Sequence, residues 1–202
     1  YFAVGYSPLT NEIIYRADKG GNENSHLYLI RDGESIDLTP GEKTKASFLG
    51  WTQDEKQMYF LSNARNPKYF DLYKTNMDDL SSKMIMENNE GYSYYPLSNN
   101  DKYLVMVKRP SRDIDLMYML DLESNEKIEI SNQESNFWGQ GFDKKDENYY
   151  YSTNYDNEFL YLMSYNIKSG KRSLVYKTEW DVTRHFLTKN DKFSVITVNE
   201  DA

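Results

Sequence analysis

The fold is decided by a short stretch at residues 50–63, which reads GWTQDEKQMYFLSN. A polar pentapeptide, Thr52–Lys56, separates the large apolar residue Trp51 from the apolar run Met58–Phe60. Asp, Asn, Ser and Thr side chains favour tight turns because they hydrogen-bond to the nearby backbone. The stretch therefore predicts a β-hairpin with the polar pentapeptide at its tip.

The same arrangement recurs three more times along the chain, and its first residues are 46, 45 and 45 positions apart. Each copy follows one large apolar residue, and an apolar run resumes six positions after its first residue; the further pentapeptides are 98–102, 143–147 and 188–192. A second marker, an apolar residue followed by Tyr, keeps nearly the same period and gives Tyr28, Tyr73, Tyr118 and Tyr161. Two markers in phase indicate a structural repeat of about 45 residues.

Each repeat predicts four short antiparallel strands, because a tight turn and a further strand follow every Tyr marker. Four strands in about 45 residues are the content of one β-propeller blade. A β-sandwich also spaces its turns regularly, but it does not explain two separate markers that stay in phase. A helical solenoid fits poorly, since the apolar residues form short runs and alternations. We therefore predict an all-β fold, a partial β-propeller of four-stranded antiparallel blades.

The length of the chain corresponds to about four and a half blades. We expect one partial propeller domain over residues 1–202, with blades at about 1–40, 41–90, 91–135 and 136–178 and the start of a fifth at 179–202. A propeller protects its strand edges by closing the ring. We therefore expect this sequence to be a fragment of a longer protein.

Composition excludes several classes of function. The net charge of −8 argues against a nucleic-acid partner, which requires a basic surface. The chain has no Cys, so it can form neither disulfides nor thiolate metal sites. Two His far apart in sequence do not suggest a zinc site, and we predict no metal and no cofactor. No apolar run is long enough for a membrane span.

The sequence lacks the signature of a serine nucleophile. The nucleophile elbow of hydrolases reads Gly-x-Ser-x-Gly, and the stretch GYSYY at 91–95 lacks the second Gly. His185, between Arg184 and Phe186 on an expected inner strand, is interpreted as structural, and His26 is expected to be solvated at a loop boundary. The paired carboxylates fall in predicted turns and are expected to be solvated. We predict no catalytic residue in this chain.

Three arginines are the candidate substrate-binding residues. Arg65 lies in SNARNPKYFD, and Arg109 and Arg112 lie in KRPSRDID. Both segments are expected to connect the second and third strands of adjacent blades, on the face that carries the blade-to-blade connections. A guanidinium there can bind a peptide carboxylate or carbonyl in a bidentate fork. The alternative, which we favour, is ion pairing with nearby acids, namely Asp71, Asp113 or Asp115.

Two runs of tyrosine, residues 92–95 and 149–151, permit two interpretations. Exposed Tyr rings could stack on sugars. Buried Tyr rings could instead fill the space between blades, because aromatic side chains supply a large apolar area. We favour the core interpretation, since the chain has 19 Tyr whose rings can supply apolar area to the core.

The blade pattern resembles the TolB-like repeat, whose hairpin usually reads Phe-Ser-Pro-Asp-Gly-Lys. The stretches at 50–63 and 95–107 are similar to it, although no copy contains the Asp-Gly dipeptide. A closer resemblance covers residues 27–78, which look like the N-terminal propeller of bacterial serine peptidases of the prolyl oligopeptidase family, in the dipeptidyl- and acylaminoacyl-peptidase branch. The segment 179–202 fits the same propeller.

The resemblance implies a function for the parent protein. In that family an α/β-hydrolase domain with a Ser-Asp-His triad follows the propeller, which restricts access to the active site. The chain would then gate and position peptide substrates for a hydrolase domain outside this sequence. The alternative is a non-catalytic TolB-like propeller that binds protein partners, and a propeller enzyme acting on polysaccharide ranks last. The resemblance favours a periplasmic or cell-envelope location over the cytoplasm, and a homo-oligomer stays open.

Overall fold

The computed structural model describes residues 2–131, 134–188 and 191–201. These residues form eighteen β-strands and no helix. Within the described part, no segment qualifies as a membrane-crossing helix. The chain divides into two compact units, residues 1–92 and residues 93–202.

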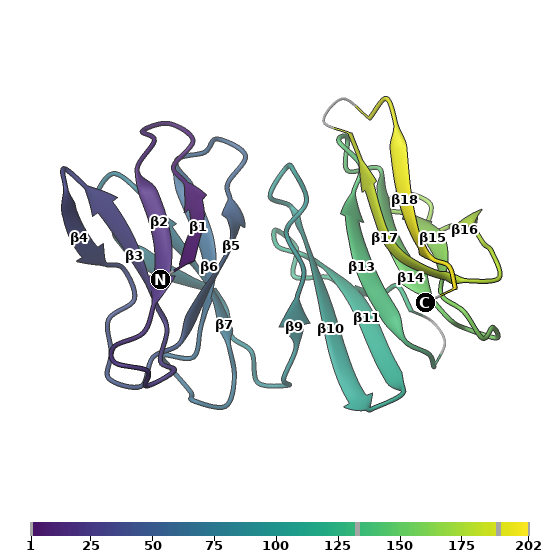
Figure 1. Ribbon diagram of the computed structural model, residues 1–202, viewed down its shortest axis with the longest axis horizontal. Coiled ribbons are helices and arrows are strands. Elements are labelled where there is room, and N and C mark those ends of the chain that lie inside the picture. Colours follow the sequence, from purple (N-terminus) through teal and green to yellow (C-terminus); the bar gives the residue numbers. More distant parts are fainter. Residues whose placement is uncertain (1, 132–133, 189–190, 202) are drawn as a thin grey trace. The chain divides into compact units, whose positions relative to one another are not determined.

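The first unit contains two four-stranded sheets, each with its strands in chain order (Figure 1). The first sheet comprises β1 (Phe2–Tyr6), β2 (Ile13–Ala17), β3 (His26–Arg31) and β4 (Glu34–Asp37). The second sheet comprises β5 (Ala46–Trp51), β6 (Gln57–Ser62), β7 (Asp71–Asn76) and β8 (Ser82–Met86). All neighbouring strands in both sheets pair antiparallel.

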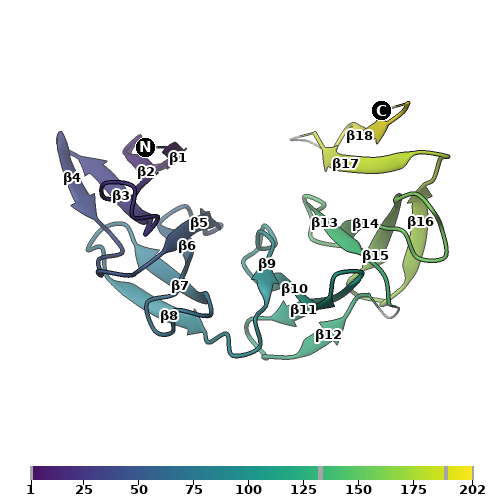
Figure 2. The same ribbon diagram turned by 60° about the horizontal axis from the view of Figure 1, so that its bottom comes forward.

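The second unit contains two further four-stranded sheets and one two-stranded sheet (Figure 2). The third sheet comprises β9 (Ser93–Tyr94), β10 (Tyr103–Ser111), β11 (Ile114–Asp121) and β12 (Lys127–Glu129). The fourth sheet comprises β13 (Phe137–Phe142), β14 (Asn148–Thr153), β15 (Tyr161–Asn166) and β16 (Arg172–Tyr176). The fifth pairs β17 (Asp181–Leu187) with β18 (Ser194–Asn199).

This architecture confirms the predicted fold class. Four sheets have four antiparallel strands in chain order, and the fifth has two, as expected for a partial β-propeller. One sheet falls in each of the five sequence ranges expected for blades.

The predicted hairpin tips share one hydrogen-bonding pattern. In the tip at 52–56, Thr52 N–H donates to Gln57 C=O at 2.9 Å, and Glu55 N–H donates back to Thr52 C=O at 2.8 Å. The tips that begin at Ser98, Asp143 and Thr188 repeat both bonds. The fourth residue of each tip has a positive φ of 54–61°, which Asn and Asp tolerate better than most residues; these are Glu55, Asp101, Asp146 and Asp191. Lys189 and Asn190 of the last tip lie outside the described residues.

Carboxylates at this fourth position join neighbouring blades of the second unit. Asp146 accepts hydrogen bonds from Asn99 N–H at 2.9 Å and Asn100 N–H at 2.8 Å, and from the Asn99 side-chain amide at 2.7 Å. One blade further on, Asp191 accepts from Lys144 N–H at 2.9 Å. The hairpin tip is therefore both a turn and an inter-blade contact.

Each unit has its own hydrophobic core. The core of the first unit joins the facing sides of its two sheets through residues such as Leu27, Leu29 and Met58. In the second unit, Tyr149 and Tyr151 are 0% and 2% exposed and pack with Phe137, Val105 and others. The core interpretation of the run 149–151 is thus confirmed for two of its three residues. Burial also raises the pKa of Tyr151 to about 12.

Gly139 lies where the core leaves no room for a side chain. A Cβ atom there would collide with the Tyr149 hydroxyl and lie 2.8 Å from a ring carbon of Tyr95. We expect Gly139→Ala to lower the free energy of unfolding by about 1–3 kcal/mol, because overpacking forces neighbouring side chains to shift. Urea unfolding measures the effect.

Gly50 supplies the matched control, since it lies in the first strand of another blade and its Cβ would meet open space. Gly50→Ala should leave the unfolding midpoint nearly unchanged. Equal effects of the two substitutions would contradict the packing explanation.

The inter-blade hydrogen bonds of Asp146 predict that two matched substitutions will differ in their effect on stability. Asp146→Gly keeps the positive φ accessible but removes the acceptor of three hydrogen bonds, so it should cost about 2 kcal/mol or more. Glu55→Gly makes the same change at the equivalent position of an exposed tip and should shift stability by less than about 0.5 kcal/mol. Thermal unfolding of both variants tests this, and a stability loss as large in Glu55→Gly would show that the turn alone is responsible.

Candidate functional site

The candidate site in each unit is the end of the sheets that carries the loops between second and third strands. Because strands alternate in direction, these loops lie at the same end of each sheet as the connections between blades. Hydrogen bonds tie the two kinds of loop together in the structure. Asp71, at the start of β7, accepts from Asn88 N–H at 2.7 Å, and Asp115 accepts from Phe137 N–H at 3.2 Å.

Arg65 is committed to contacts within its own blade. Its Nε and one terminal nitrogen each donate to the Asp71 carboxylate at 2.8 Å, and the latter nitrogen also donates to Asn88 C=O at 3.1 Å. The other terminal nitrogen lies 3.0 Å from Glu87. The hydrogen bond with Asp71 raises the pKa of Arg65. The ion-pair interpretation is confirmed here, and this guanidinium fixes the loop.

Arg109 repeats the fork in the second unit but is more open to solvent. Its Nε donates to Asp115 at 2.6 Å and a terminal nitrogen donates to the other carboxylate oxygen at 3.3 Å. The Asp115 side chain is fully buried, whereas the Arg109 side chain is 60% exposed. Asp115 raises the pKa of Arg109 through the hydrogen bond. More than half of this side chain therefore stays accessible while its charge is held in place.

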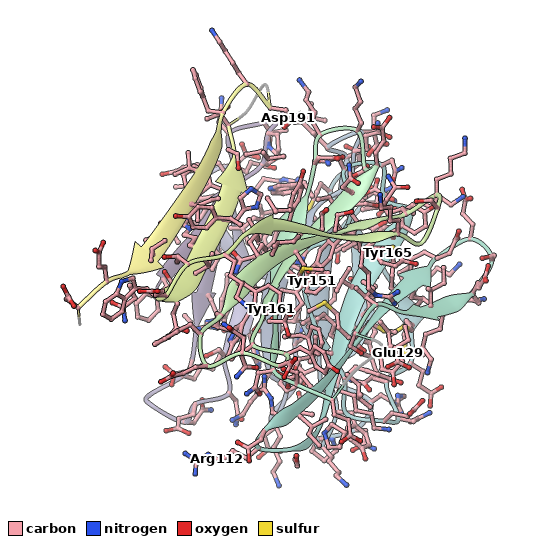
Figure 3. All side chains as sticks on the ribbon, turned by 90° about the vertical axis from the view of Figure 1, so that its right-hand side faces the viewer. Arg112, Glu129, Tyr151, Tyr161, Tyr165 and Asp191 are labelled. Carbon is pink, nitrogen blue, oxygen red and sulfur yellow. The ribbon has the colours of Figure 1, made fainter. Side chains whose placement is uncertain are left out.

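Arg112 is the exposed member of the three. It follows β10 in the turn to β11, and Figure 3 shows its side chain projecting from the second unit. Within the described residues, its guanidinium makes no hydrogen bond or ion pair, and the expected pair with Asp113 is not formed. Arg109 lies within β10, not in the loop where the sequence analysis placed it, and Arg112 lies in the turn that follows; Arg65 lies in the first unit.

The first blade departs from this pattern in a way that the sequence analysis missed. His26 takes the place that Asp71 and Asp115 hold in later blades, and its Nδ1 shares a hydrogen bond of 2.8 Å with Asp37 on β4. The expectation that His26 is solvated is wrong, because the residue is 6% exposed. The signal available in the sequence was the exchange of an acid for His at a repeated position.

A polar pocket of about 340 Å³ adjoins this pair. Its lining combines cationic, anionic and amide groups: Lys19, Asn22, Asn24, His26, Asp37, Pro40, Gly41 and Glu42. None of these residues carries a hydroxyl or thiol nucleophile. The described residues also contain no cluster of three His, Cys, Asp or Glu side chains arranged to hold a metal ion. The pocket therefore offers hydrogen bonds of both polarities to a ligand.

Blade four uses a third solution at the same end of its sheet. Asp181, the first residue of β17, accepts from Leu160 N–H at 2.8 Å, and Val182 N–H donates to Leu160 C=O at 2.9 Å. Glu158, which precedes the Tyr marker of this repeat, is exposed. The carboxylate is therefore half-buried and is supplied by the first strand of the next blade instead of by the third strand of blade four.

His185 has a structural environment, as the sequence suggested. It is 3% exposed, its Nε2 lies 3.0 Å from Ser194 Oγ, and its backbone N–H donates to Gln140 at 2.8 Å. Its ring also packs on Tyr150, with ring centroids 4.5 Å apart. Burial lowers the pKa of His185 below its ordinary value of 6.5.

The repeated four-stranded antiparallel blades define the chain as a β-propeller. Residues 3–191 match the family described as prolyl oligopeptidase, N-terminal beta-propeller domain. The chain belongs to this family.

Known proteins with similar sequences or structures agree with this assignment. Dipeptidyl aminopeptidase BIII of Pseudoxanthomonas mexicana is 28% identical over 111 residues, which are 54% of this chain and 16% of that protein. Prolyl oligopeptidase B from Galerina marginata superposes with a TM-score of 0.69 at 13% identity, over 97% of this chain and 32% of that chain. TolB from Acinetobacter baumannii gives 0.64 at 13% identity, over 92% and 46%. The chain thus spans less than half the length of each of these proteins.

The two environments of arginine predict opposite effects of substitution. Arg65→Ala removes the cation that neutralises the fully buried Asp71 carboxylate, so it should lower the unfolding midpoint clearly. Arg112→Ala removes an exposed side chain and should leave the midpoint unchanged. Thermal unfolding compares the two, and a loss of stability in Arg112→Ala would contradict its assignment as a free surface group.

The lowered pKa of His185 predicts a pH dependence of stability. The unfolded state binds a proton near pH 6.5, and the folded state binds it only at lower pH. The contribution of neutral, buried His185 to the free energy of unfolding is therefore fully present above pH 6.5, and it is lost as the pH falls below that value. Urea unfolding between about pH 7 and pH 5 measures this loss.

His185→Gln keeps a hydrogen-bonding side chain beside Ser194 and cannot take up this proton. Its stability should fall less steeply with decreasing pH than that of the unsubstituted chain. Identical slopes would show that His185 does not contribute.

Proposed function

We propose that this chain is the propeller segment of a serine peptidase of prolyl oligopeptidase type, which gates and positions peptide substrates for an α/β-hydrolase domain outside the chain. The observation that carries the proposal is the family match over residues 3–191. A relative named as a dipeptidyl aminopeptidase supports the same reaction class. The chemistry would be acyl transfer by a serine of the hydrolase domain, so the propeller supplies no reacting group.

The loop end of the sheets in the second unit is the surface that we propose contacts the peptide. Arg112 is exposed, and Arg109 is held by Asp115 while 60% of its side chain stays accessible. Guanidinium groups bind carboxylates and carbonyl oxygens through two parallel N–H donors. Arg112 and Arg109 are therefore proposed to hold a peptide carboxylate or backbone carbonyl, and Arg65 to keep its loop in shape.

A second candidate function is a non-catalytic propeller that binds protein partners. The structural similarity to TolB from Acinetobacter baumannii favours it, although a likeness at 13% identity reports the fold alone. The two functions differ in one measurable property, which is a reactive serine in the protein that carries this segment.

The first experiment labels that full-length protein with a fluorophosphonate probe, which modifies activated serines. We expect labelling, together with hydrolysis of dipeptidyl chromogenic substrates. Absence of both would overturn the peptidase proposal and leave the binding function.

The second experiment tests the arginine face in the same protein. Arg112→Ala should raise KM for peptide substrates several-fold and leave kcat unchanged, because it removes a binding contact distant from the bond that breaks. Lys145→Ala is the matched control, since it removes an exposed positive charge from a hairpin tip at the opposite end of the sheets. An equal change in KM in both variants, or none in Arg112→Ala, would argue against substrate contact at this face.

A further inference from the structure

The outer strand β16 differs from the other outer strands of the four complete blades. It is the last strand of its sheet and pairs only with β15, so no strand among the described residues covers its other edge. Proteins commonly protect such edges with charged side chains or very short strands. The outer strands β4 and β12 follow this rule, since they read ESID and KIE.

Strand β16 instead presents apolar side chains to solvent. Leu174, Val175 and Tyr176 are 58%, 40% and 41% exposed, and they follow one another along the strand. A β-bulge sets Val175 apart, because Leu174 pairs with Met163 and Tyr176 pairs with Leu162. An exposed apolar edge of this kind is a template for a further strand.

The charge around β16 is opposite to that of the whole chain. Residues 166–178 contain four cations and no Asp or Glu, in a protein of net charge −8; the cations are Lys168, Lys171, Arg172 and Lys177. The corresponding segments around β4, β8 and β12 all contain carboxylates. The edge is therefore both apolar and basic.

Two of these cations are held in place by neighbouring groups. Arg172 donates to the backbone carbonyls of Ile130 at 2.8 Å and Glu129 at 3.0 Å and lies over the Tyr165 ring. The Lys177 ammonium lies 5.1 Å from the centre of the Tyr161 ring. Lys168 and Lys171 are exposed at the turn before the strand. The positive charge is thus fixed at both ends of the apolar segment.

We propose that β16 is a docking edge for an extended segment of a partner protein that has an apolar centre with acidic residues on both sides of it. Backbone hydrogen bonds to the open edge would add this segment as a further strand of the sheet. Leu174 and Tyr176 pair with the successive residues Met163 and Leu162, so they lie on opposite faces of the sheet. The apolar centre of the partner covers both side chains, and its flanking carboxylates face the cations at the two ends of the apolar segment. A second copy of this chain fits less well, because pairing β16 with itself brings like charges together.

The test uses a fluorescently labelled seven-residue peptide of three central Val with two Glu on each side, titrated with the full 202-residue chain. We expect saturable binding by fluorescence anisotropy, weakening as salt is raised, and slower hydrogen exchange of the β16 amides. A peptide with Lys in place of Glu should not bind. Leu174→Glu should weaken binding at least about tenfold, since it places a carboxylate in the apolar contact.

Met84→Glu is the matched control. Met84 occupies the equivalent place on β8, where it precedes the same kind of bulge and is 39% exposed. The Met84→Glu variant should bind the peptide as the unsubstituted chain does. Equal unfolding midpoints of the Met84→Glu and Leu174→Glu variants will show that both fold.

Three outcomes would overturn the proposal. The first is no saturable binding of the Glu–Val peptide, or equal loss in the two variants. The second is self-association of the chain in sedimentation that Leu174→Glu abolishes, which would make a second copy the occupant. The third is binding to anionic lipid vesicles, but not to the peptide, that depends on Leu174.

Discussion

Carboxylate oxygens that accept backbone N–H groups from a neighbouring blade are the interaction on which this structure depends. A four-stranded blade is apolar on the faces that meet its neighbours, so burial alone brings blades together without fixing their alignment. Asp146 and Asp191 provide that alignment at the hairpin tips of the second unit. Asp115 does so at the other end of the sheets, through Phe137. Directional bonds to charged acceptors thus complement a non-directional hydrophobic contact.

The same structural problem is solved differently in successive blades. The loop before the third strand must be tied to the connection that follows, and blades two and three use a buried Asp with an Arg. In blade one, His26 is hydrogen-bonded to Asp37 at the end of β4, and in blade four Asp181, the first residue of β17, accepts from Leu160 N–H. The repeat therefore conserves a geometric requirement while it exchanges the residues that meet it. Where the exchange places a His beside a polar pocket, the face gains chemistry that the other blades lack.

The sequence predicted the blades well because their signals are local. Turn residues, apolar runs and Tyr markers lie within a few positions of one another, and their period of about 45 residues places each sheet. It predicted the ion pairs of Arg65 and Arg109 for the same reason, since each partner is six residues away. It did not predict the burial of His26, because its partner Asp37 lies on the next strand, 11 residues away. Nor did it indicate the contacts of Asp146, whose partners lie 46 and 47 residues away.

The hairpin tips explain how the repeat can be regular in structure and irregular in sequence. The Asp191 carboxylate binds the backbone N–H of Lys144, and Asp146 binds those of Asn99 and Asn100, which are amides that nearly any residue possesses. The side chain of Asn99 adds one further bond to Asp146. Side-chain identity in the tips is therefore less constrained than the number of residues, because an insertion would displace the backbone amides. Neighbouring blades therefore recognise each other by loop length. A search for relatives of this propeller should give more weight to the spacing of the hairpin tips than to the amino-acid identities within them.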